Sequence, residues 1–144
     1  MINKSFLKAW LIAARIKTLP AAISPVFVGT ALAYRDNYYN KYTFISIIIA
    51  SILIQIGTNL SNDLSDFLKG TDTDERLGPQ RVAQSGLLST KQLKKGIVII
   101  FSLSIIIGIY LVLIGGYPIV IIGLTSIACG ILYTAGPYPL GYNG

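Results

Sequence analysis

The sequence predicts an all-α protein, a multi-pass bundle of about four transmembrane helices. Of its 144 residues, 53% are hydrophobic and only 12% are charged, whereas soluble domains usually carry about 25% charged residues. The mean hydropathy is +0.64. Long segments contain almost no charged residue, so the chain has too little polar surface to cover them in water. A lipid bilayer is the solvent that fits this composition.

Four segments are apolar over a length that suits transmembrane helices. They are residues 19–34, 42–60, 97–114 and 117–135. The first is close to the minimum length and contains Pro20 and Pro25. These prolines disturb helical hydrogen bonding, which membranes tolerate where neighbouring helices or a cavity satisfy the freed carbonyl groups.

The basic residues are distributed unevenly between the connections. Of the twelve Lys and Arg residues, four precede the first segment, two separate the first and second, and six separate the second and third. Because basic connections tend to stay in the cytoplasm, we expect the N-terminus and residues 61–96 to be cytoplasmic, in a cell membrane (inner or plasma membrane). The positive charge is then a signal of orientation, and we expect no nucleic-acid partner.

The residue types exclude several classes of site. The chain has no histidine and a single cysteine, Cys129, which lies in an apolar segment. An intrachain disulfide is therefore excluded, as are catalytic triads with histidine and most zinc sites. Any chemistry must use carboxylates, amides, hydroxyls and cations.

Residues 61–96 form the one long polar stretch and contain five of the six acidic residues. Four polar residues recur at helical spacing where the second segment ends: Asn59, Asn62, Asp63 and Asp66. This spacing places them within roughly a 100° arc on one face of a helix. Two carboxylates at a membrane boundary need a compensating cation, and Mg²⁺ binds one or two carboxylates and completes its shell with water and phosphate. The pattern therefore predicts a Mg²⁺ site for a ligand that carries a diphosphate.

Two arginines, Arg76 and Arg81, follow a second group of acids that includes Asp72. Guanidinium groups suit phosphate oxygens, so Mg²⁺ and these arginines together would neutralise a diphosphate and make it a better leaving group. Two simpler interpretations stay open. The arginines can pair with the neighbouring acids, and the whole stretch can be a solvated charged loop beside the membrane.

The sequence motifs resemble those of a known family. The run NDLSDFLKGTD is preceded by RIKTLPAAISPVFVGTALAY, followed by RLGPQRVAQSGLLS, and the chain ends in YTAGPYPLGYNG. This ordered combination is similar to the 1,4-dihydroxy-2-naphthoate polyprenyltransferases of the UbiA superfamily of intramembrane prenyltransferases, and it covers the chain from Arg15 onward. The resemblance implies transfer of a polyprenyl group from polyprenyl diphosphate to 1,4-dihydroxy-2-naphthoate, with loss of carbon dioxide, in menaquinone biosynthesis.

The resemblance also implies roles for individual residues. Asp63 and Asp66 would be catalytic and, together with Asp72, would be the ligands of Mg²⁺. The wider superfamily has an acid where this sequence has Gly70, so Asp72 is the less direct match. Tyr133 would stabilise an allylic carbocation or belong to the aromatic belt at the membrane interface. The candidate substrate-binding residues are Asn59, Asn62, Lys69, Asp72, Arg76, Arg81 and Tyr133.

Other functions stay open at this point. The acceptor can be another aromatic compound, such as homogentisate or 4-hydroxybenzoate, although Gly70 and the RLGPQR stretch argue against it. The chain can also be a transporter or channel subunit whose acidic loop binds cations without catalysis. Family members resemble bundles of eight or nine helices with two Asp-rich motifs, of which these residues contain the first. We therefore expect an N-terminal half that does not catalyse transfer by itself.

Overall fold

The computed structural model describes residues 4–70 and 81–142, and its elements are helices. They are α1 (Lys4–Ala14), the short 3-10 helix η1 (Ile16–Thr18), α2 (Leu19–Arg35), α3 (Lys41–Lys69), α4 (Thr90–Gly115) and α5 (Tyr117–Leu132). No strand occurs in the described residues, so the predicted all-α class is confirmed. Three helical stretches are long and apolar enough to cross a membrane, namely Ser5–Arg35, Lys41–Lys69 and Thr90–Gly115, while α5 is apolar but shorter.

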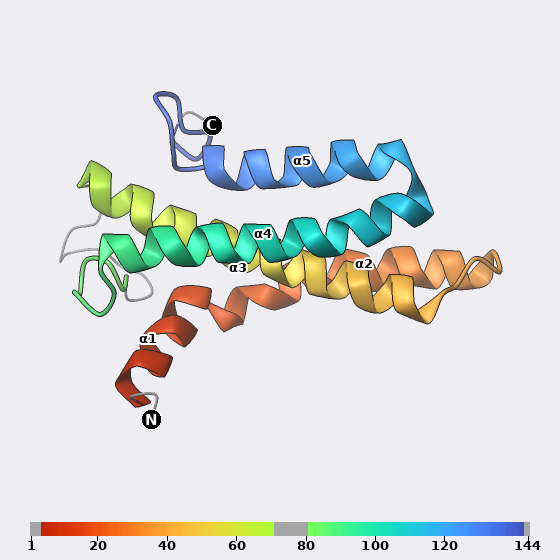
Figure 1. Ribbon diagram of the computed structural model, residues 1–144, viewed down its shortest axis with the longest axis horizontal. Coiled ribbons are helices and arrows are strands. Elements are labelled where there is room, and N and C mark those ends of the chain that lie inside the picture. Colours follow the sequence, from red (N-terminus) through yellow and green to blue (C-terminus); the bar gives the residue numbers. More distant parts are fainter. Residues whose placement is uncertain (1–3, 71–80, 143–144) are drawn as a thin grey trace.

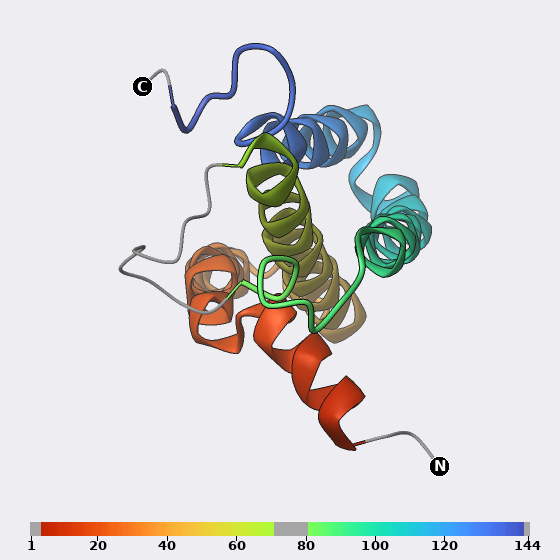
Figure 2. The ribbon, with the colours of Figure 1, turned by 90° about the vertical axis from the view of Figure 1, so that its left-hand side faces the viewer.

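The central helix of the bundle is α3, which contacts α1, α2, α4 and α5. Figure 2 looks along the bundle and shows the other helices around α3. Helices α2 to α5 follow the long axis of the molecule, whereas α1 leaves this axis obliquely (Figure 1). The α2–α3 and α4–α5 links lie at one end. The other end, called the polar end below, holds the C-terminal turns of α3, the start of α4 and residues 133–142.

Capping residues set the ends of α3 and α4. The side chain of Asn40 accepts hydrogen bonds from the backbone N–H groups of Tyr42 and Thr43, at 2.9 and 3.1 Å, which starts α3. Gly70 ends it in the left-handed region, at φ 67°. Helix α3 therefore continues to Lys69, well past the apolar residues 42–60. A capping box between Ser89 and Gln92 starts α4 ahead of its apolar part.

Helix α5 ends at Leu132, before the end of the apolar segment at residue 135. Gly136 has φ 86°, and the following residues include Pro137 and Pro139, which lack a backbone N–H donor. The N–H of Leu140 donates to the carbonyl of Leu132 at 3.1 Å. The chain therefore turns back at this point and covers the end of the bundle.

The buried core lies at the polar end. Its members come from α1, α3, α4 and the connection before α4: Ala9, Ala13, Leu60, Leu64, Val82, Ala83, Leu88 and Leu93. In contrast, α2 and α5 contain no buried residue. Their apolar side chains face outward, as expected of helices whose solvent is lipid.

Candidate functional site

The polar face predicted for α3 is present, and it is buried at the polar end of the bundle. Asn59, Asn62, Asp63 and Asp66 are 3%, 9%, 1% and 4% exposed. Burial of this much polar surface requires hydrogen-bond partners. Each of the four side chains has different hydrogen-bond partners, and these partners belong to several neighbouring segments.

Asn59 faces the junction between α1 and α2. Its Nδ2 donates to the carbonyl oxygen of Ala14 at 2.9 Å and to Oγ1 of Thr18 at 3.0 Å. Between these two residues, Arg15 adopts the left-handed region, with φ 50° and ψ 60°, and this separates α1 from η1. Asn59 therefore holds the break in the N-terminal helix against α3, apart from the two carboxylates.

Asp63 binds backbone amides of the connection before α4. Its Oδ2 accepts from the N–H of Val82 at 3.0 Å, and its Oδ1 accepts from the N–H of Ala83 at 3.2 Å. Both carboxylate oxygens are thus used within the fold. The side chain is the least exposed of the four polar residues on this face.

Asp66 forms a buried ion pair with Arg81. Nη2 of Arg81 donates to Oδ2 of Asp66, and the two side chains are 6% and 5% exposed. The hydroxyl of Tyr142 donates to the second oxygen, Oδ1. The interpretation in which Arg81 pairs with an acid is therefore the one that the geometry supports, with an acid of α3 as the partner.

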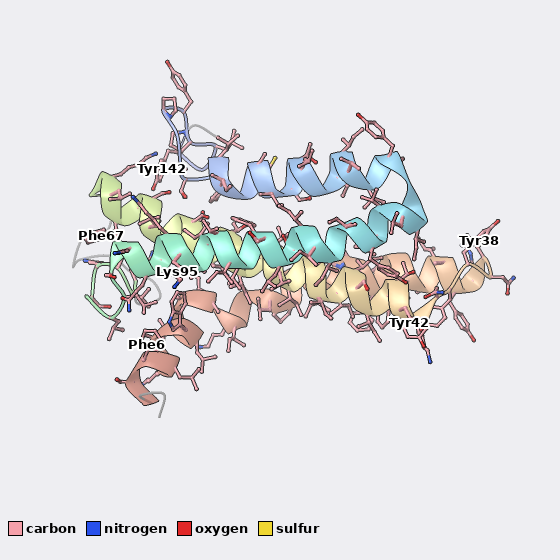
Figure 3. All side chains as sticks on the ribbon, viewed as in Figure 1. Phe6, Tyr38, Tyr42, Phe67, Lys95 and Tyr142 are labelled. Atoms are coloured by element: carbon pink, nitrogen blue, oxygen red, sulfur yellow. The ribbon has the colours of Figure 1, made fainter. Side chains whose placement is uncertain are left out.

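Residues 133–142 form a strap, called the C-terminal strap below, across the end of α3. The hydroxyl of Thr134 donates to Oδ1 of Asn62 at 2.9 Å. Nζ of Lys69 donates to the carbonyl oxygens of Thr134 and Gly136, at 2.7 and 3.1 Å, and lies 5.4 Å from the centre of the Tyr142 ring. Figure 3 shows Tyr142 and Phe67 of α3 at this same end.

Tyr142 is the tyrosine that reaches the acidic face, whereas the side chain of Tyr133 is 51% exposed and lies beside Gly141. Sequence reasoning selected Tyr133 because it lies at the end of the fourth apolar segment, residues 117–135. It missed Tyr142, Thr134 and Thr18. Tyr142 does stand in the YTAGPYPLGYNG run, but nothing in its spacing indicates that its hydroxyl points to Asp66.

The ligand chemistry of this end suits Mg²⁺ in part. Asp66 offers two carboxylate oxygens, which accept from Arg81 and Tyr142, and carboxylate oxygens are ligands that Mg²⁺ takes in proteins. The third predicted ligand, Asp72, and the predicted diphosphate-binding Arg76 lie outside the described residues. Within residues 4–70 and 81–142, no group of three or more Asp, Glu, His or Cys side chains could hold a metal ion. The described residues alone therefore do not complete a metal site.

Comparison with known proteins identifies the family. The model of the UbiA prenyltransferase family matches residues 22–144. Proteins named 1,4-dihydroxy-2-naphthoate octaprenyltransferase are similar to this chain. That of Haemophilus influenzae is 38% identical, and the match covers 100% of this chain and 49% of the relative. That of Escherichia coli is 36% identical, and the match covers 95% of this chain and 46% of the relative. That of Bacillus subtilis is 32% identical over 90% and 42%.

The chain spans about half the length of the curated relatives that it matches. No solved structure matches it. The family model covers the polar face of α3, the Arg81 connection and the C-terminal strap. Its apolar helices make it a membrane protein, and with this match the chain belongs to the UbiA prenyltransferase family.

Proposed function

We propose that the chain takes part in the transfer of a polyprenyl group from polyprenyl diphosphate to 1,4-dihydroxy-2-naphthoate, with loss of carbon dioxide, in menaquinone biosynthesis. The observation that carries the proposal is the buried Arg81–Asp66 pair at the end of an apolar bundle, in a chain of this family. The names of the relatives support the same acceptor and donor, each over about half of the relative's length.

The bundle offers separate environments for the two parts of such a donor. A groove of about 530 Å³ runs between α3, α4 and α5, and apolar side chains such as Ile54, Ile105 and Ile127 line it. Charged groups lie at the polar end, among them Asp66, Arg81 and Lys69. A polyprenyl tail fits the first environment and a diphosphate the second.

The side chains at the polar end can assist departure of the diphosphate. Arg81 carries a permanent positive charge and a planar guanidinium that suits phosphate oxygens. Mg²⁺, held by Asp66, would draw electron density from the diphosphate and so favour cleavage of the allylic carbon–oxygen bond. A ring carbon of the acceptor would then form the new carbon–carbon bond while the ring carboxylate leaves as carbon dioxide. Burial excludes water that would otherwise capture the allylic cation.

We further propose that the polar end faces the cytoplasm in a cell membrane. Lys69, Arg81, Lys91, Lys94 and Lys95 are all near this end, whereas the α2–α3 link at the opposite end carries Arg35 and Lys41. Basic residues concentrate on the cytoplasmic side of membrane proteins. This orientation presents the charged groups of the polar end to the cytoplasm, and it places the N-terminus in the cytoplasm as well.

Binding of a labelled donor tests the proposal. The chain is reconstituted in liposomes, and retention of radiolabelled octaprenyl diphosphate is measured with and without Mg²⁺. We expect retention that requires Mg²⁺ and is lost in Asp66→Asn. The control is Asp36→Asn, which changes an exposed acid at the opposite end. Cation flux through the liposomes without Mg²⁺-dependent retention would refute the proposal and support a transport function.

The acceptor is tested in a chimera that joins this chain to the remaining half of the Haemophilus influenzae relative. Membranes with the chimera are supplied with octaprenyl diphosphate and one of three acceptors: 1,4-dihydroxy-2-naphthoate, homogentisate or 4-hydroxybenzoate. We expect a prenylated, decarboxylated product from the naphthoate. Faster turnover of either other acceptor would contradict the proposed substrate.

A further inference from the structure

We infer that Asp63 is a positioning residue: its carboxylate holds the turn 81–86 against α3 and thereby places Arg81 on Asp66, and it is not a ligand of the metal ion. The two carboxylates of the NDLSD run then have different tasks. The roles of Arg81 and Asp66 toward a diphosphate rest on the proposed function, whereas the contacts of Asp63 do not.

The geometry at Asp63 is that of a cap on a turn. Its two oxygens accept from two successive backbone N–H groups, those of Val82 and Ala83, at 3.0 and 3.2 Å. The turn is closed by the N–H and the hydroxyl of Ser85, which donate to the carbonyl oxygen of Arg81 at 3.1 and 2.7 Å. Successive amides at the start of a helical turn are a favourable environment for an anion.

The turn is also fixed from its apolar side. Val82, Ala83 and Leu88 are buried in the core cluster together with Leu60 and Leu64 of α3. Arg81 directly precedes the first amide bound by Asp63, so the position of its backbone follows from this anchoring. Its guanidinium then meets Asp66, which lies on the same face of α3 almost one turn beyond Asp63.

Metal binding at Asp63 conflicts with these contacts. A bound ion would have to reach a carboxylate that is 1% exposed, and room for Mg²⁺ and the water that it retains requires the turn 81–86 to move away from α3. This movement frees the N–H of Val82 or Ala83. The freed amide would remain buried without a partner, which is costly. Asp66, in contrast, is held by the side chains of Arg81 and Tyr142, and side chains can exchange partners by changing rotamer.

Hydrogen exchange at two amides tests the first part of the inference. The chain is placed in lipid nanodiscs, and exchange at Val82 and Ala83 is followed by NMR. We expect Asp63→Asn to accelerate exchange by about tenfold or more, and the control variant Asp36→Asn, at an exposed acid of the opposite end, to change it by less than about threefold. Equal rates in wild type and Asp63→Asn, or equal acceleration in both variants, would overturn the inference.

A measurement on the unmodified chain applies even where Asp63→Asn fails to fold. If Asp63 is a metal ligand, saturating Mg²⁺ must move the turn 81–86 to admit the ion, and this movement accelerates exchange at Val82 and Ala83. We expect both amides to exchange at the same rate with and without Mg²⁺. Acceleration by Mg²⁺ would assign Asp63 to the metal.

Ligand binding tests the second part, that Asp63 acts through Arg81. Mn²⁺ binding is measured by electron paramagnetic resonance, and pyrophosphate binding by calorimetry in the presence of Mn²⁺. We expect Asp66→Asn to lose Mn²⁺. We expect Asp63→Asn to keep Mn²⁺ and to weaken pyrophosphate binding by about tenfold, as Arg81→Gln does, with no further loss in the double variant.

Additive losses in the double variant, or loss of Mn²⁺ in Asp63→Asn, would contradict a positioning role. Arg35→Gln is the control, because it removes an exposed arginine at the opposite end of the bundle. If the unmodified chain binds neither Mn²⁺ nor pyrophosphate, the proposed function fails. The exchange rates of Val82 and Ala83 still decide what Asp63 does in that case.

Discussion

The ion pair between Arg81 and Asp66 lies in a part of the protein that excludes water from both side chains. Removing two charges from water costs several kcal/mol per ion, and their attraction repays this cost only where other groups satisfy the remaining lone pairs. The hydroxyl of Tyr142 does so at Asp66. A buried ion pair of this kind is therefore weak evidence for stability. In the proposed function, Arg81 would exchange the carboxylate of Asp66 for the diphosphate of the donor.

Breaking this pair from one side should destabilise the protein strongly. We expect Arg81→Gln to lower the free energy of unfolding by about 3 kcal/mol, because the charge of Asp66 stays buried without its partner. The double variant Arg81→Gln/Asp66→Asn should recover part of the loss. Thermal unfolding in detergent measures both. Arg35→Gln, at the exposed pair with Asp36, should leave the unfolding temperature unchanged, and an equal loss there would contradict the argument.

Asn59 and Thr18 should act as a unit at the break between α1 and α2. Nδ2 of Asn59 donates to Oγ1 of Thr18, whose hydroxyl donates to the carbonyl oxygen of Arg15 at 2.9 Å. In a double-mutant cycle of Asn59→Ala and Thr18→Ala, we expect a coupling free energy of about 1 kcal/mol. Unfolding in detergent provides the four values. Strictly additive losses would show that the two side chains act separately.

Helical spacing was sufficient to predict the face that carries Asn59, Asn62, Asp63 and Asp66, because all four lie on one regular helix. It was not sufficient to predict their partners. Tyr142 and Thr134 reach this face from 76 and 72 residues away along the chain. Periodicity carries no information about such contacts, because they depend on how the C-terminal strap folds back across α3.

At the scale of helices, close packing depends on small residues. A Cβ atom at Gly57 of α3 would lie 2.6 Å from the ring of Phe101 of α4, and that ring is buried. Between helices in lipid, association relies on such close approach, since water provides no hydrophobic driving force there. The close packing of α3, which carries Asp63, against α4 therefore depends on a glycine at position 57.

A matched pair of substitutions tests this packing. We expect Gly57→Ala to lower the free energy of unfolding by about 1–3 kcal/mol through overpacking against Phe101. Gly108→Ala in α4 is the control, because nothing lies within 4 Å of a Cβ atom there, and alanine favours a helix over glycine. Thermal unfolding in the same detergent compares the two. If both variants unfold at the same temperature, α3 and α4 can move apart at position 57 without a measurable loss of free energy, which would contradict the prediction.

The ends of the helices were predictable only where a capping residue marks them. Gly70 after α3 and the Ser89–Gln92 pair before α4 are such marks, and they set the ends of the two helices beyond their apolar runs. The break at Arg15 has no such mark, because arginine rarely adopts the left-handed region. That break depends on tertiary contacts with Asn59, which the local sequence does not encode.

Considered as a whole, the molecule is asymmetric along its long axis. The buried core and the acidic face share the polar end, whereas the opposite end holds short links. Figure 3 shows Tyr38 and Tyr42 at that end, far from Tyr142 and Lys95. Hydropathy and the distribution of basic residues were enough to predict that the acidic stretch and the short links lie at opposite ends, because both act over whole segments. They did not predict that the buried core lies at the polar end, since this depends on contacts between particular side chains.

Two tyrosines with nearly equal exposure make the orientation testable. Tyr38 in the α2–α3 link is 84% exposed, and Tyr138 in the C-terminal strap is 83% exposed. Each is replaced by cysteine in a Cys129→Ser background, which removes the single native thiol. In spheroplasts we expect a membrane-impermeant maleimide to label Tyr38→Cys and to spare Tyr138→Cys. In inverted vesicles the pattern should reverse, since the basic polar end stays in the cytoplasm. Labelling of Tyr138→Cys from outside would place the acidic face on the outer side of the membrane and would contradict the proposed orientation.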